Sequence, residues 1–153
     1  MENATQALLI GAGVLIGVLI LSLAVYLFNT FGAYATDTQK KVDEKALAQL
    51  NAKFYKYDGL EDINIQDIIT IKNYAIENNK KDSNYNWEQN RADANNEYID
   101  VFYGKRNNLR LIFGESDEHL LKSESTKKFT CEVEVNAQTG RINRVFFYEM
   151  SNW

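Results

Sequence analysis

The residues of this chain that could carry covalent chemistry are Cys131, its only cysteine, and His119, its only histidine. A thiol beside an imidazole can form a nucleophile and its base, so the pair is a candidate for nucleophilic catalysis. Cys131 lies in a run that alternates apolar and polar residues, which predicts a buried thiol that behaves as a small apolar side chain with a raised pKa. His119 lies in a charged run, which predicts a solvated surface histidine. We therefore expect no catalytic residues and no enzyme activity.

Three carboxylates, Asp58, Glu61 and Asp62, flank Gly59 and could supply oxygen ligands to calcium. Their spacing departs from that of a DxDxDG calcium loop, and the dipole of a following helix explains these acidic residues equally well. One cysteine and one histidine cannot complete a zinc site, and the sequence has no glycine-rich phosphate loop. The sequence predicts no metal and no cofactor.

The charge and the cysteine content argue against a nucleic-acid-binding protein and against a domain stabilised by intrachain disulfides. The 17 basic residues are dispersed among 21 acidic ones, and the net charge is -4, so no basic stripe exists to bind nucleic acid. A single cysteine cannot form an intrachain disulfide, so the fold must be stabilised by its core.

Residues 7–28, ALLIGAGVLIGVLILSLAVYLF, contain no charged side chain. As a helix this run reaches about 33 Å, enough to cross a hydrocarbon core of about 30 Å. A removable signal peptide is the alternative, but the run is longer than a typical apolar core of such a peptide, and MENATQ before it has no lysine or arginine. We expect a retained, single-pass span in the cell membrane, with the lipid bilayer around it.

Three small residues of this span, Gly13, Gly17 and Ala24, fall on one helix face. The GxxxG step allows a second helix backbone to approach closely in lipid, although glycine is also common in membrane helices in general. These residues are our candidates for helix packing, either in self-association or with another membrane protein.

Past the span, the apolar residues recur every three or four positions, which predicts an amphipathic helix that continues the first one and ends near Gly59. Gly32 could form a flexible joint between the two parts. A second helix should begin at Asn64, whose pairing with Asp67 is of the capping-box type. We assign residues 1–35 to the membrane span and membrane-proximal segment, and residues 36–153 to a small α+β domain that includes the amphipathic helix.

Four later segments have the aromatic, β-branched and alternating character of strands: 98–103, 109–113, 129–135 and 141–148. We predict an α+β fold in which the long N-terminal helix and the second helix pack on an antiparallel sheet of three or four strands. Residues 115–128 are mostly polar, and their pattern indicates neither a helix nor a strand.

The polar stretch 82–96 predicts a surface loop, in which Tyr85 and Trp87 are isolated aromatic residues. These two side chains, together with Tyr98, Phe102 and Trp153, could form an exposed patch that binds a partner. Alternatively, most of these rings complete the small core.

The order of elements resembles that of type IV pilins and pilin-like proteins, in which an apolar N-terminal helix continues into an amphipathic half that packs on a small sheet. That resemblance implies a filament subunit with an extracytoplasmic domain. Pilins use a glutamate at position five to neutralise a neighbour's amino terminus, whereas this chain has Thr5 and its nearest acid is Glu2. Glu2 is therefore the candidate subunit contact. The motifs FYKYDG, DIITIKN and FTCEVEV with TGRI also look like those of uncharacterised single-span bacterial membrane proteins.

Two features of the chain predict opposite orientations of the domain in the membrane. Lys40, Lys41 and Lys45 follow the span while no basic residue precedes it, and the positive-inside rule then places the domain in the cytoplasm. The pilin resemblance implies the opposite side. The function we expect is a membrane-anchored, pilin-like structural or interaction subunit that assembles through its N-terminal helix. The alternative is a single-span protein whose small domain is a binding or adaptor module for a protein partner.

Overall fold

The computed structural model describes residues 1–150, which divide into two compact units, Met1–Ala46 and the part from Leu47 onward. The elements, in chain order, are α1 (Glu2–Tyr55), α2 (Ile65–Asn79), β1 (Asp100–Lys105), β2 (Asn108–Leu111), the short 3-10 helix η1 (Ile112–Gly114), α3 (Asp117–Ser123), β3 (Phe129–Val135) and β4 (Ile142–Glu149).

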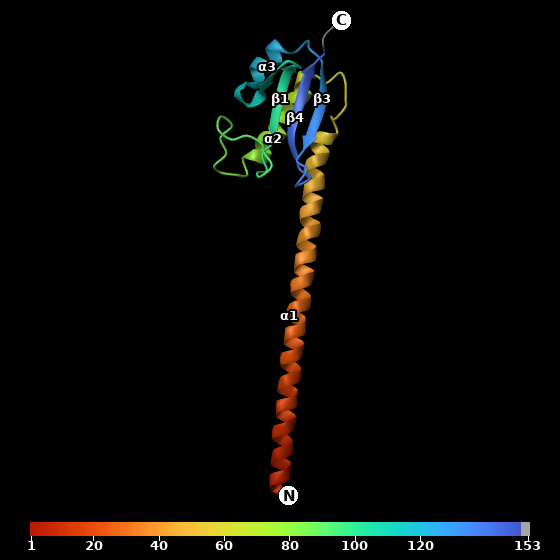
Figure 1. The fold of residues 1–153 in the computed structure, drawn as a ribbon, viewed down its shortest axis with the longest axis vertical. Helices are drawn as coiled ribbons and strands as arrows, with labels where there is room; N and C mark the ends of the chain where they lie inside the picture. Colours follow the sequence, from red (N-terminus) through yellow and green to blue (C-terminus); the bar gives the residue numbers. More distant parts are fainter. Residues whose placement is uncertain (151–153) are drawn as a thin grey trace. The chain divides into compact units, whose positions relative to one another are not determined.

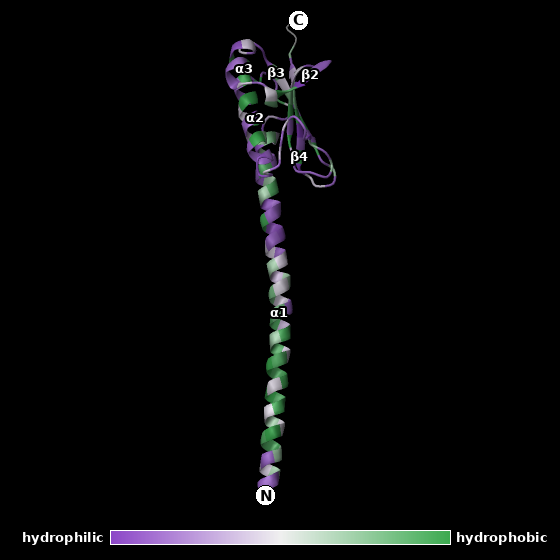
Figure 2. Ribbon diagram, turned by 90° about the vertical axis from the view of Figure 1, so that its left-hand side faces the viewer, coloured by the Kyte–Doolittle hydropathy of each residue, from purple (hydrophilic) through white to green (hydrophobic). Residues whose placement is uncertain are grey.

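Apart from Met1, the first unit consists of α1 residues alone. The helix continues through Gly32, so the expected joint is ordinary helix. Its side chains are exposed, apart from a half-buried Ala24. Figure 2 shows the apolar stretch as the green part of α1, and it is the one helix among residues 1–150 that is long and apolar enough to cross a membrane.

The second unit contains a four-stranded sheet in the order β2-β1-β4-β3 (Figure 1). β1 pairs antiparallel with β2, and β3 pairs antiparallel with β4, as two hairpins do. The central pair, β1 and β4, is parallel, so the sheet is mixed rather than antiparallel as predicted. The reason is the segment 112–128, which contains η1 and α3 and carries the chain across before β3 begins. The α+β class is confirmed.

The strand boundaries differ slightly from the predicted ones. The first strand begins at Asp100 rather than at residue 98, and it extends to Lys105. The second strand ends at Leu111, because Ile112 to Gly114 form a turn of 3-10 helix. The ambiguous segment after them contains α3, which Ser116 caps by accepting a hydrogen bond from the His119 amide.

The helices α2 and α3 lie on one side of the sheet (Figure 2). The predicted capping box at the start of α2 is present: Asn64 Oδ1 accepts from the Asp67 amide at 3.0 Å, and Asp67 Oδ2 accepts from the Asn64 amide at 3.4 Å. The core between helices and sheet consists mainly of aliphatic and aromatic side chains, among them Phe54, Ile68, Ile71, Ile99, Val101, Tyr103, Phe129, Val145 and Phe147.

The final turns of α1, from Leu47 to Tyr55, belong to the second unit. Phe54 is fully buried in the core, and its ring meets that of Tyr74 edge-on at 6.4 Å. Asn51 donates to the Gly140 carbonyl at 2.8 Å and accepts from the Ile142 amide at 3.2 Å. The amphipathic pattern therefore correctly predicted a helix that contributes to the core of the domain.

Candidate functional site

Cys131 and His119 have different surroundings. Cys131 is 4% exposed on β3, and burial raises the pKa of its thiol to about 12, as the alternating pattern predicted. His119 is exposed on α3, where its Nε2 lies 3.6 Å from Glu115 Oε2. Asp58, one of the carboxylates considered for calcium, accepts a hydrogen bond from the Val133 amide at 3.0 Å. Within residues 1–150, no group of three or more metal-ligating side chains comes together.

Tyr85 and Trp87 do come together, in a surface hollow of about 380 Å³ that we call the Trp87 hollow. It lies between α2, the loop 82–96 and η1. The remaining lining residues are Ile76, Lys80, Asn86 and Phe113.

Trp87 is 38% exposed, so part of its ring is available to a ligand. Its indole rests against Gly114, where an added Cβ would lie 3.0 Å from the ring edge. A glycine at that position therefore lets the indole approach the backbone of η1 closely. A partly exposed indole that packs on the backbone suits binding of an apolar or aromatic group.

The loop that carries Trp87 is ordered by its own asparagines. Asn86 accepts from the Glu88 amide at 2.9 Å, and Asn90 accepts from the Asn86 amide at 2.7 Å. Arg91 donates to the Trp87 carbonyl. A loop tied to itself in this way can position an aromatic side chain without regular secondary structure.

Asn79, the last residue of α2, holds together the two segments that flank this loop. Its side chain donates to the Ile99 carbonyl at 3.0 Å and accepts from the Ile99 amide at 2.8 Å. Asn79 is buried, and the two bonds attach the C-terminus of α2 to the start of β1.

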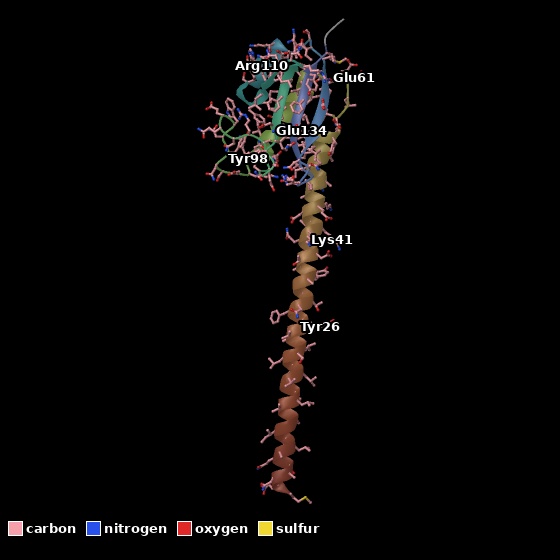
Figure 3. All side chains as sticks on the ribbon, viewed as in Figure 1. Tyr26, Lys41, Glu61, Tyr98, Arg110 and Glu134 are labelled. Atoms are coloured by element: carbon pink, nitrogen blue, oxygen red, sulfur yellow. The ribbon has the colours of Figure 1, made fainter. Side chains whose placement is uncertain are left out.

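The other aromatic residues of the predicted patch lie elsewhere. Tyr98, labelled in Figure 3, packs against Tyr85 with ring centroids 4.8 Å apart and donates to Asp82 Oδ2. It does not line the hollow. Phe102 lies on the other face of the sheet, stacked on Phe146 at 5.4 Å. Trp153 lies outside the described residues. Among the described residues, these aromatics therefore do not form a single patch.

The predicted helix-packing residues, Gly13, Gly17 and Ala24, all lie in α1, within an arc of about 40° at the usual 100° per residue. A Cβ added at either glycine would meet no atom within 4 Å. The backbone at this face is thus open to a neighbouring helix. Glu2 is exposed in the first turn of the same helix.

No protein-family model, curated protein or solved structure matches the chain. The elements of the fold define its class. It is a small α+β domain with a mixed sheet, preceded in the chain by a helix that is long and apolar enough to cross a membrane. A long apolar N-terminal helix followed by a small sheet domain is compatible with a pilin-like architecture.

Proposed function

We propose that this protein is a single-pass, pilin-like membrane subunit that self-associates through α1. The observation that carries the proposal is the apolar stretch of α1, which no other part of residues 1–150 buries. A buried Leu, Ile or Val side chain contributes roughly 1.5–3 kcal/mol, so a stretch of this composition requires cover by lipid or by other helices.

The face that contains Gly13, Gly17 and Ala24 is the proposed contact between subunits. Within a membrane, helix association depends on close packing, because lipid tails are as apolar as the side chains they surround. Glycine removes the side chain that would keep two backbones apart. Glu2 is then placed to pair with the amino terminus of a neighbouring subunit, and the domain lies on the extracytoplasmic side, as in pilins.

Glycine substitutions test the contact. In purified full-length protein in detergent, we expect wild-type oligomers, and we expect Gly13→Ile and Gly17→Ile to weaken association by at least tenfold because the branched side chain holds the helices apart. Gly11→Ile is the matched control, since Gly11 lies about 160° from Gly13 around the helix and also has open space at its Cβ. Sedimentation equilibrium measures the effect. A monomeric wild type, or equal losses in all three variants, would contradict the proposal.

A second candidate function is a single-span binding module for a protein partner. The Trp87 hollow favours it, because this surface site joins an exposed indole to Phe113 and Ile76. We expect Trp87→Ala to abolish cross-linking of the protein to a partner in native membranes. Tyr55→Ala, which removes an exposed ring outside the hollow, should leave the cross-linked species unchanged. Cross-linking that persists in Trp87→Ala would exclude this candidate.

A further inference from the structure

The two edges of the sheet differ in whether another segment of the chain hydrogen-bonds to them. The β3 edge is closed by the chain that precedes α2: the Gly59 amide donates to the Cys131 carbonyl at 3.0 Å, and Ile63 and Phe129 exchange two hydrogen bonds of 2.9 Å. The opposite edge is β2, which has no such cover among residues 1–150. Unpaired strand edges offer a row of backbone donors and acceptors to another chain.

The register of the β1–β2 hairpin shows which groups of β2 point outward. A Cβ at Gly104 would lie 2.7 Å from the Asn108 carbonyl oxygen, so that carbonyl points toward β1. Backbone direction alternates along a strand, so the amide and carbonyl of Leu109 and the amide of Leu111 point away from β1. Within the described chain, no loop, turn or side chain bonds to these three groups.

Positive charge gathers around this open edge. Lys105, Arg106 and Arg110 form no salt bridge with any described residue, although the chain as a whole has a net charge of -4. The Arg106 guanidinium stacks on Tyr148 at 4.3 Å, and that of Arg110, labelled in Figure 3, lies over Tyr103 at 5.2 Å. Aromatic contacts hold these guanidinium groups in place and leave their charge without an acidic partner.

A hollow of about 290 Å³ lies beside the hairpin, on the same face of the sheet as Arg110 and Tyr103. Glu124 and Glu149 line it, and both lie within 3.4 Å of Lys127 Nζ. Lys105 and Arg110 also line it and form no salt bridge with a described residue, so the lining carries three cations and two carboxylates. On the opposite face, Leu109 and Leu111 are half-buried and pair with Gly104 and Phe102.

We propose that the β2 edge binds an extended acidic peptide segment of a partner protein by adding it to the sheet as a fifth strand. The free groups of Leu109 and Leu111 supply main-chain hydrogen bonds. A residue opposite Arg110 projects to the cationic side and is acidic, while its two neighbours project beside Leu109 and Leu111 and are apolar. A second copy pairing through its own β2 would place like charges together, so the occupant is a different, acidic chain.

A labelled peptide, TVEVEVT, tests the proposal by fluorescence anisotropy with the full-length protein in detergent. We expect it to bind, and we expect the lysine analogue TVKVKVT to bind at least tenfold more weakly. N-methylation of the valines, whose amides would face β2, should abolish binding, whereas N-methylation of the glutamates should leave it intact. Equal binding of the two methylated peptides, or of the acidic and basic peptides, would overturn the proposal.

A protein variant gives a second measurement. The φ of Leu111 is -70°, which proline adopts, so Leu111→Pro removes the outward amide while the backbone keeps its conformation. Leu111→Ala removes the same side chain and retains the amide. We expect at least tenfold weaker binding for the proline variant than for the alanine variant, and equal affinities would count against strand addition. This binding does not require association of α1, so it can fail or succeed independently of the proposed function.

Discussion

Burial decides the chemistry of Cys131, the residue that first invited a catalytic interpretation. A thiol with a pKa of about 12 is almost entirely protonated at neutral pH, and the protonated form is a poor nucleophile. Its alternation with polar neighbours in the sequence predicted this burial. The role of Asn79, by contrast, had no sequence signal, because its partner Ile99 lies 20 residues away and becomes a neighbour only in the fold.

We predict that Cys131 reacts slowly with iodoacetamide in the folded protein. At pH 8 about one thiol in ten thousand is ionised when the pKa is 12, against roughly a quarter at the ordinary value of about 8.5. Mass spectrometry of labelling in buffer and in denaturant measures the two rates. Labelling at the same rate in both conditions would show that the thiol is accessible and reactive in the native state.

Among the elements, the end of α1 has a defined structural role. Phe54 fills the core of the domain, while Asn51 bonds to the backbone on both sides of Arg141, at the start of β4. The sequence predicted this helix well because its apolar residues recur at every three or four positions, which is the period of an α-helix. The parallel pairing of β1 with β4 could not be predicted in the same way, because strand order depends on where the chain crosses over between hairpins.

We predict that Phe54→Ala lowers the free energy of unfolding by about 3–5 kcal/mol, the range for removing a buried phenylalanine. Val42→Ala, at a side chain that is 56% exposed in the other unit, should change it by less than about 0.5 kcal/mol. Urea unfolding of the detergent-solubilised protein, followed by circular dichroism, measures both values. Comparable losses in the two variants would mean that Phe54 is not a core residue.

At the scale of the whole molecule, the chain combines an apolar helical stretch that needs external cover with a domain that has its own core. The glycine face of α1, the Trp87 hollow and the β2 edge are three distinct surfaces, each with its own test. Self-association would involve the first, and binding of a partner would involve the second or the third. The proposed extracytoplasmic position of the domain implies that the partner comes from that side of the membrane.

The sequence by itself determined the apolar span, the amphipathic helix, the capping box of α2 and the burial of Cys131. Each depends on residues close together in the chain, where periodicity and side-chain type act directly. Only the tertiary structure decided the mixed sheet, the assembly of Tyr85 and Trp87 with Ile76 and Phe113, and the open cationic edge at β2. These features depend on contacts between distant segments, and no local pattern encodes which segments the chain brings together.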